Sequence, residues 1–155
     1  MSTPVIGEAV ADFELDATGD QRIRLSDLKG KKVVLYFYPK DNTPGCTQEG
    51  KDFRDNIAAF EAANTVVFGV SRDTLRKHEN FKAKYDFPFE LLADTESNVC
   101  DQFDIIRMKS TFGKTALGLV RSTFLIDENG ILRQEWRALR VKGHVEEVLA
   151  AAQAL

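Results

Sequence analysis

Two kinds of hydrophobic spacing recur along the chain. Nearly continuous apolar runs at 32–38 and 65–70 predict strands that are covered on both faces of a sheet. Residues 13–15 and 22–25 instead alternate apolar and polar side chains around Thr18-Gly19-Asp20, which predicts a β-hairpin. Further strands are expected at 89–92, 121–126 and 131–136, the last two joined by the turn-forming segment 127–130.

Apolar residues at steps of three and four predict the helices. The clearest face is formed by Cys46, Gly50, Phe53, Ile57 and Phe60. This helix is expected to begin at Pro44, with Thr43 as its N-cap. Other helices are expected at 74–85, 97–103 and 143–155, with a short helical turn at 26–30.

Strands alternate with helices through the middle of the chain, and an antiparallel hairpin and a helix end it. This order predicts an α/β sandwich around a mixed sheet. Residues 107–118 are polar and contain glycine, so a loop is expected there. No repeat, low-complexity segment or linker divides the sequence, so residues 1–155 are expected to form one domain.

The composition and charge of the chain argue against several classes of binding partner and location. A net charge of −3 and a pI near 5.5 give no reason to expect nucleic acid or an anionic membrane surface. No apolar run approaches the roughly 20 residues that span a bilayer, and the acidic start of the chain does not predict a secretory signal. The 2 cysteines are too few for a disulfide scaffold, which favours a reducing cytoplasm.

Cys46 lies where a predicted strand, a polar loop and a helix N-terminus follow one another. Unpaired N–H groups and the helix dipole stabilise a thiolate at such a position. The Thr43 hydroxyl, one helical turn away, is placed to hydrogen-bond the sulfur or a bound oxygen. From these residues alone, a buried and inert cysteine remains the alternative.

Pro39, Thr43 and Cys46 form Pro-x-x-x-Thr-x-x-Cys, the signature of the peroxiredoxins, and Glu49 continues it. The segment 121–127 resembles the strand on which that family carries its second active-site arginine motif. Three further segments resemble the bacterioferritin comigratory protein (PrxQ) branch: Phe-Arg-Asp at 53–55, Leu-Leu-Ala-Asp at 91–94 and Cys-Asp-Gln-Phe-Asp at 100–104. The resemblance extends from about residue 5 to residue 150.

The resemblance implies a thioredoxin-like fold with an N-terminal β-hairpin extension. It also implies reduction of hydrogen peroxide and organic hydroperoxides, in which Cys46 becomes a sulfenic acid. In that scheme Arg121 keeps Cys46 ionised and polarises the O–O bond, Thr43 orients the peroxide, and Pro39 shields the thiolate from water. No metal, flavin or nucleotide is implied, and the branch is often monomeric. Without the resemblance, Arg121 is simply a solvated charge and Pro39 a strand terminator.

The reductant of the sulfenic acid is the open question. Members of the branch carry a second cysteine at the positions of Lys51 or Lys82, and both are lysine here. The other thiol, Cys100, shares an apolar face with neighbouring residues and is expected to be buried. We therefore favour a 1-Cys peroxidase reduced by thioredoxin, glutaredoxin or glutathione. Resolution by Cys100 and a redox sensor that does not turn over remain alternatives.

Two other functions are disfavoured by the sequence. A disulfide oxidoreductase usually carries Cys-x-x-Cys, and residue 49 is glutamate. His78 and His144 are far apart, with no cysteine or acid at ligand spacing, so no zinc site is expected. His78 is instead expected at the edge of the core, and His144 in the first turn of the last helix.

Overall fold

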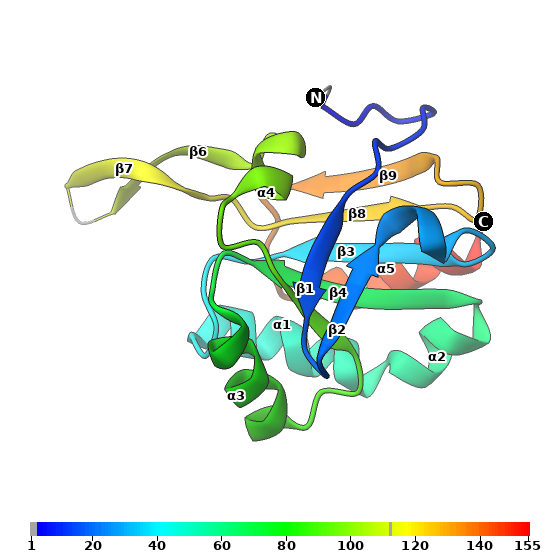
Figure 1. Ribbon diagram of the computed structural model, residues 1–155, viewed down its shortest axis with the longest axis horizontal. Helices are drawn as coiled ribbons and strands as arrows, with labels where there is room; N and C mark the ends of the chain where they lie inside the picture. Colours follow the sequence, from blue (N-terminus) through cyan, green and yellow to red (C-terminus); the bar gives the residue numbers. More distant parts are fainter. Residues whose placement is uncertain (1–2, 112) are drawn as a thin grey trace.

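The protein is a seven-stranded mixed sheet with helices packed against it, in a computed structural model that describes residues 3–111 and 113–155 (Figure 1). The strand order is β2-β1-β5-β4-β3-β8-β9, with β3 parallel to β4 and antiparallel to β8. The sheet strands are β1 (Glu14–Ala17), β2 (Gln21–Arg24), β3 (Lys32–Phe37), β4 (Thr65–Ser71), β5 (Glu90–Ala93), β8 (Ser122–Ile126) and β9 (Leu132–Arg137). The expected mixed α/β fold with its N-terminal hairpin is confirmed.

The helices agree with the sequence pattern except at one break. They are η1 (Leu25–Leu28, a 3-10 helix), α1 (Pro44–Asp55), α2 (Ile57–Ala62), α3 (Leu75–Tyr85), α4 (Asn98–Gln102) and α5 (His144–Gln153). The single helix expected from residue 44 to residue 60 is divided at Asn56. There the side-chain amide of Asn56 donates to the Asp52 carbonyl oxygen at 2.8 Å and so satisfies an acceptor at the helix end.

The two faces of β3 open onto two separate hydrophobic clusters. Odd-numbered residues of β3 enter one cluster and even-numbered apolar residues enter the other, because side chains alternate along a strand. Cys100 packs with Phe103 in the first cluster, and Cys46 packs with Phe53 in the second. The two cysteines therefore lie on opposite faces of the central sheet.

Close packing fixes helix α1 against its neighbours. A Cβ atom added at Gly50 would lie 2.4 Å from Cζ of Phe87, so only glycine permits this approach. Phe87 in turn stacks on Phe89, with ring centroids 5.2 Å apart. Gly50 thus lets α1 approach the segment that precedes β5 closely.

The prediction of a loop at 107–118 is wrong. These residues form an antiparallel pair, β6 (Ile106–Thr111) and β7 (Lys114–Leu119), which projects from the body of the molecule (Figure 1). Met108 and Leu117 face each other across the pair and are 62% and 65% exposed. Leu119 at the base of β7 is buried, but the rest of β7 is exposed or half-buried. The pair therefore carries no hydrophobic alternation, and the sequence pattern gave no signal for it.

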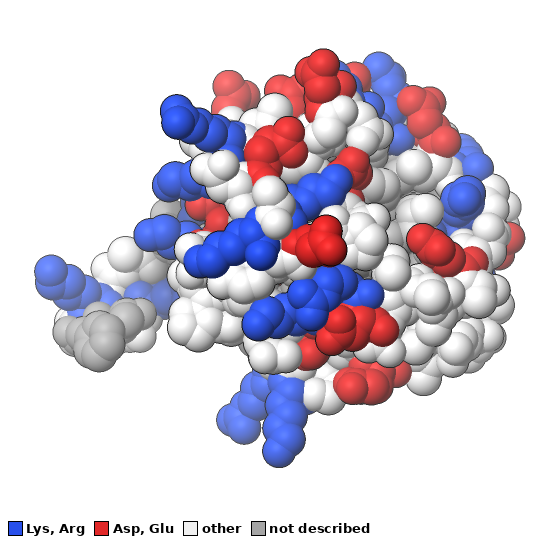
Figure 2. All heavy atoms as spheres, turned by 90° about the horizontal axis from the view of Figure 1, so that it is seen from below, with Lys and Arg blue, Asp and Glu red and all other residues white. Residues whose placement is uncertain are grey.

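The charged surface fits the composition. Lysine and arginine are interspersed with aspartate and glutamate over the face in Figure 2, with no large patch of one sign. Among the residues that the structure describes, no helix has both the length and the apolar character needed to cross a membrane.

Candidate active site

Cys46 lies in the first turn of α1 and is 1% exposed. Thr43 is at the N-cap and Pro44 at the first helical position, as the sequence predicts. The Thr43 side chain does not accept a capping hydrogen bond from the helix, and its hydroxyl donates to the Lys40 carbonyl oxygen at 2.8 Å. Cys46 is thus within the positive end of the helix dipole, where an anion is stabilised.

The guanidinium of Arg121 is in contact with the sulfur. Its Nη2 atom donates to Cys46 Sγ at 3.3 Å, although the residues are 75 positions apart. Antiparallel pairing explains the contact, because Ser122 at the start of β8 lies opposite Phe37 at the end of β3. The loop that leads to α1 begins just after that end of β3. The predicted pairing of Cys46 with a distant arginine is therefore present in the structure.

Glu49 holds the other end of the same guanidinium. Arg121 Nη1 donates to Glu49 Oε1 at 2.7 Å, and the Glu49 side chain is fully buried. Burial raises the pKa of Glu49 to about 7, against the opposing charge of Arg121. Burial alone would lower the pKa of Arg121, but Glu49 and Cys46 outweigh it and hold that pKa above its usual value. The Arg121 guanidinium therefore donates both to Cys46 and to Glu49, which lie on one face of α1.

Tyr36 and Gly45 lie near the contact between Cys46 and Arg121. Tyr36 stacks on Phe53 with ring centroids 4.5 Å apart, and its buried hydroxyl has no hydrogen-bond partner among the described residues. Burial raises the pKa of Tyr36 well above its usual value, so this hydroxyl keeps its proton. At Gly45, an added Cβ would lie 3.1 Å from Arg121 Nη2, so a side chain there would crowd the guanidinium.

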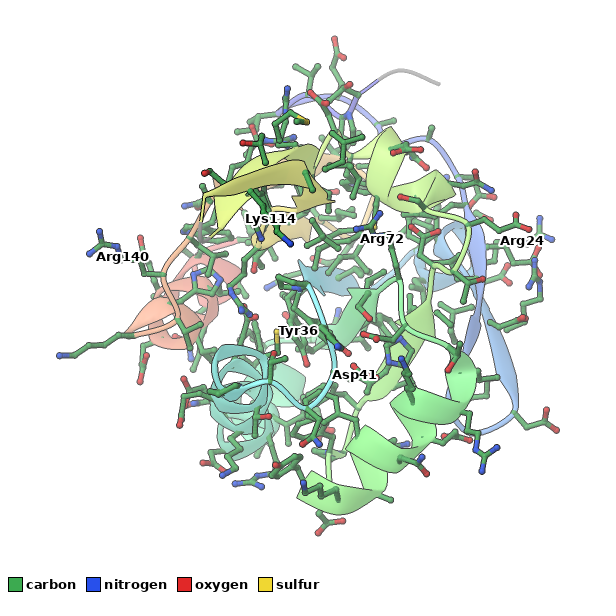
Figure 3. All side chains as sticks on the ribbon, turned by 90° about the vertical axis from the view of Figure 1, so that its left-hand side faces the viewer. Arg24, Tyr36, Asp41, Arg72, Lys114 and Arg140 are labelled. Carbon is green, nitrogen blue, oxygen red and sulfur yellow. The ribbon has the colours of Figure 1, made fainter. Side chains whose placement is uncertain are left out.

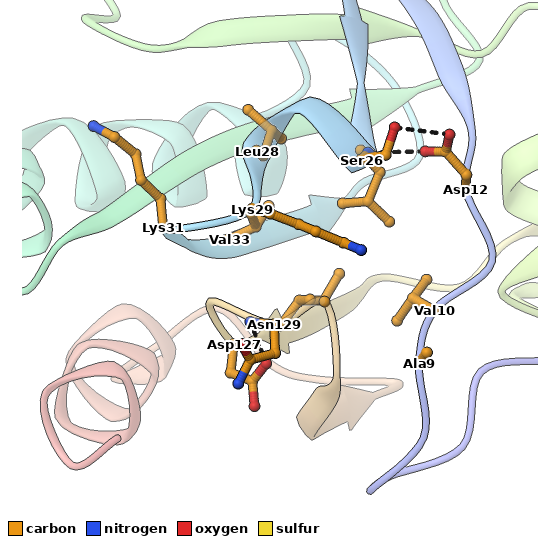
Figure 4. A pocket seen from close by; sticks show the side chains of 13 residues that line it. Ala9, Val10, Asp12, Ser26, Leu28, Lys29, Lys31, Val33, Asp127 and Asn129 are labelled. Carbon is orange, nitrogen blue, oxygen red and sulfur yellow. Dashed lines mark hydrogen bonds between the residues drawn. The ribbon is translucent and has the colours of Figure 1, made fainter.

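Pro39 and Thr43 stand at the two ends of the loop between β3 and α1. Tyr38, just before Pro39, makes the last sheet-like bond through its N–H to the Val70 carbonyl oxygen at 3.0 Å. Pro39 is partly buried. Neither residue hydrogen-bonds the sulfur as Arg121 does, so their predicted roles rest on the motif. A separate pocket near Asp12, where Ser26 donates two hydrogen bonds, contains none of these residues (Figure 4).

A family model described as the AhpC/TSA family matches residues 6–135, which is most of the chain. This chain belongs to the AhpC/TSA family. It is 49% identical over 144 residues to Peroxiredoxin Bcp of Bacillus subtilis, covering 93% of this chain and 92% of that protein. The expected membership of the peroxiredoxins is confirmed.

Solved structures agree with the sequence relatives. A structure of Xanthomonas campestris Peroxiredoxin Q matches with a TM-score of 0.90 and 42% identity, covering 99% of this chain and 97% of that one. A bacterioferritin comigratory protein of the same organism, described in connection with its alkyl peroxide reduction activity, matches with a TM-score of 0.90, 41% identity and coverage of 99% and 97%. The expected thioredoxin-like peroxiredoxin fold is confirmed.

Cys100, Lys51 and Lys82, the positions considered for a second cysteine, lie outside the site of this peroxiredoxin. Cys100 is fully buried in α4, and its backbone N–H donates to Asp94 at 2.8 Å. Burial, reinforced by the Asp94 carboxylate, raises the pKa of the Cys100 thiol well above its usual value. Lys51 places its amine 5.2 Å from the centre of the Tyr85 ring. Lys82 forms an ion pair with Glu90.

Some features of the site carried little or no signal in the sequence. Glu49 belongs to the motif, but its spacing shows only that it shares a helix face with Cys46. Tyr36 looks like an ordinary core aromatic, and Gly45 like an ordinary loop glycine. The expectation for His78 is wrong, because this residue is 0% exposed and lies inside the core rather than at its edge.

Proposed function

We propose that this peroxiredoxin reduces peroxides through the Cys46 thiolate. The thiolate attacks the distal oxygen of the hydroperoxide, a sulfur–oxygen bond forms, and the O–O bond breaks. Cys46 becomes a sulfenic acid, and the departing alkoxide takes a proton to leave as an alcohol, or as water from hydrogen peroxide. The observation that carries this proposal is the 3.3 Å contact between Arg121 Nη2 and the sulfur in a nearly closed site.

The surrounding residues supply the electrostatics of this step. Arg121 favours the thiolate and then stabilises negative charge that develops on the departing oxygen, which a fixed cation does best in a dry site. Thr43 orients the peroxide, since its hydroxyl oxygen can still accept a hydrogen bond while its proton is held by Lys40. Pro39 limits the access of water to the thiolate. No metal or organic cofactor enters this scheme.

The sulfenic acid is reduced by an external thiol. Cys46 and Cys100 pack in clusters on opposite faces of the sheet, whereas a disulfide needs Cα atoms within about 7 Å. Burial and Asp94 also hold Cys100 in its unreactive thiol form. An external thiol attacks the sulfenic sulfur, releases water and leaves a mixed disulfide, which a second thiol reduces. Thioredoxin, glutaredoxin and glutathione are the candidate reductants.

Treatment with one equivalent of peroxide tests both parts of the proposal. The oxidised protein is trapped with a sulfenic-acid reagent, alkylated and analysed by peptide mass spectrometry. We expect the trapped group on Cys46 and a free thiol at Cys100. An intramolecular disulfide between the two would overturn the 1-Cys assignment in favour of the 2-Cys alternative. Absence of any oxidation at Cys46 would overturn the site.

Turnover separates an enzyme from a redox sensor. With excess dithiothreitol, a peroxidase consumes many equivalents of peroxide, whereas a sensor is oxidised once and stops. We expect continuous consumption. The further proposal is that residues 1–155 form one cytoplasmic domain that acts as a monomer. The same preparation run on a sizing column tests the monomeric state.

A further inference from the structure

A further cluster of buried polar and charged side chains surrounds His78. This side chain projects from α3 and is 0% exposed. Its Nδ1 atom lies 2.7 Å from Asp41 Oδ2, and its Nε2 atom lies 2.9 Å from the Leu92 carbonyl oxygen. Both ring nitrogens therefore face oxygen atoms, at hydrogen-bonding distance, in a region closed to solvent.

The Asp41 carboxylate and the Leu92 carbonyl determine which ring nitrogens of His78 are protonated. A backbone carbonyl only accepts hydrogen bonds, so Nε2 must carry a proton to bond Leu92. Asp41 and His78 share one further proton, which belongs on the imidazole because it is ordinarily the more basic group. The ionised Asp41 carboxylate then only accepts, and Nδ1 donates to it. An imidazolium beside an aspartate satisfies every contact, and it also avoids leaving a charged carboxylate in the interior without a counter-ion.

Asp41 connects this pair to the peroxidatic loop. It lies between Pro39 and Thr43 in the chain, and Figure 3 labels it beside Tyr36, whose pKa it helps to raise. The Tyr38 hydroxyl donates to Asp41 Oδ1 at 2.6 Å. The Asp41 backbone N–H donates to Asp73 Oδ2 at 2.8 Å. Both carboxylate oxygens and the N–H of this loop residue are thus bonded to buried or partly buried groups.

We propose that His78 is held as an imidazolium and is a positioning residue for the peroxidatic loop. This rests on the proposed function, because the loop matters as the support of Thr43 and Cys46. The ion pair with Asp41 ties the middle of the loop to α3, and the bond to Leu92 ties α3 to β5. Thr43, which hydrogen-bonds Lys40 within the same loop, is thereby kept where it can orient a peroxide.

His144 provides an internal reference, because the chain has 2 histidines. It is also buried, but its Nε2 atom faces the Thr123 hydroxyl at 2.8 Å, a group that can donate or accept. Burial lowers the pKa of His144 to about 4, so this ring is neutral at pH 7. Two buried histidines in one molecule are thus assigned opposite protonation states.

Nitrogen-15 NMR of the histidine side chains tests the protonation state directly. At pH 7 we expect two protonated ring nitrogens for His78 and one protonated plus one bare nitrogen for His144. The variant Asp41→Asn keeps an oxygen for Tyr38 and presents an N–H₂ group to Nδ1. In this variant we expect His78 to become neutral. A bare nitrogen on His78 in the unaltered protein would overturn the assignment, whether or not the protein is a peroxidase.

The positioning role is tested by comparing two reactions of Cys46. For His78→Gln and Asp41→Asn, we expect the rate constant with peroxide to fall about tenfold while alkylation by iodoacetamide changes by less than about twofold. Loss of structure would instead change both rates. Arg76→Gln, at an exposed position of the same helix, is the matched control and should alter neither. Unchanged peroxide rates in both test variants, or parallel changes in the two reactions, would overturn the role.

Discussion

Cys46 and Cys100 are equally hidden from solvent but have opposite electrostatic surroundings. Their exposed fractions are 1% and 0%. Cys46 has an arginine nitrogen at 3.3 Å and a helix N-terminus around it. Cys100 has the Asp94 carboxylate as its nearest charged group, and burial together with that carboxylate raises the pKa of its thiol. Burial therefore does not separate a reactive cysteine from an inert one in this fold; the sign of the adjacent charge does.

The fold creates this difference through strand order. Pairing of β8 with β3 brings Arg121 to the start of α1, where it contacts the Cys46 sulfur. At Cys100 the charge of Arg72 acts in the same sense, but burial and Asp94 outweigh it. The short helix α4 instead begins where Asp94 accepts hydrogen bonds from the backbone N–H groups of Val99 and Cys100. These bonds occupy the donors that could otherwise stabilise a Cys100 thiolate.

The largest effect on peroxide turnover is expected from replacing each cysteine separately by serine. Cys46→Ser should lower peroxide turnover by at least about a thousandfold, because the hydroxyl is a far weaker nucleophile at neutral pH. Cys100→Ser should stay within about twofold of the unaltered protein. Steady-state peroxide consumption with dithiothreitol measures both. Equal losses in the two variants would remove the functional distinction between these cysteines.

Removal of the cation should make Cys46 resemble Cys100. Arg121→Met keeps much of the side-chain volume but leaves Glu49 without its counter-ion, so the matched background is Glu49→Gln. In that background we expect Arg121→Met to lower the rate constant with peroxide about a hundredfold. Alkylation of Cys46 at pH 7 should slow as well, since the cation in contact with the sulfur is removed.

Arg121→Lys is the control for charge. A lysine keeps the positive charge but cannot hold the sulfur and Glu49 at once with two nitrogens of one planar group. We expect a rate constant between those of the unaltered protein and the methionine variant. If lysine and methionine were equally slow, geometry rather than charge would account for the role of Arg121.

Glu49, beside Cys46, should make the free energy of unfolding depend on pH between about 4.5 and 7. Its pKa is about 7 when folded, against 4.5 as its ordinary value, so the folded protein holds more protons between those limits. Its contribution to stability is therefore lost as the pH rises from about 4.5 to about 7 and is constant above that. Between pH 4.5 and pH 7, the free energy of unfolding of the unaltered protein should fall by roughly 3 kcal/mol relative to that of Glu49→Gln, as measured by urea unfolding. Parallel curves would contradict the assigned burial.

The sequence predicted those parts of the structure that leave a hydrophobic or a spaced signal. Burial on both faces made the segments at 32–38 and 65–70 recognisable as strands, and the motif identified Cys46. The exposed pair β6–β7 leaves no such signal. The stripe that contains Ile57 and Phe60 stays in phase across Asn56, which concealed the break between α1 and α2.

Features that depend on long-range packing were not accessible from the chain alone. Glu49 shares a face with Cys46 in any helix, but its burial and its ion pair require β8 to deliver Arg121. His78 fits the apolar stripe of α3, and nothing local indicates that Asp41 and Leu92 meet both of its nitrogens. Polar contacts between distant elements have no periodic signature, so they appear only in the folded structure.

The smallest effect should come from shortening the inert cysteine. Cys100→Ala removes one buried sulfur from the cluster that contains Phe103, which should lower the free energy of unfolding by about 1 kcal/mol. Urea unfolding measures this loss, and peroxide turnover should be unchanged. A stable Cys100→Ala protein with turnover reduced more than about tenfold would show that the sulfur takes part in the catalytic cycle. A loss of stability with unchanged turnover would show that Cys100 contributes only to packing and that Cys46 is the reacting thiol.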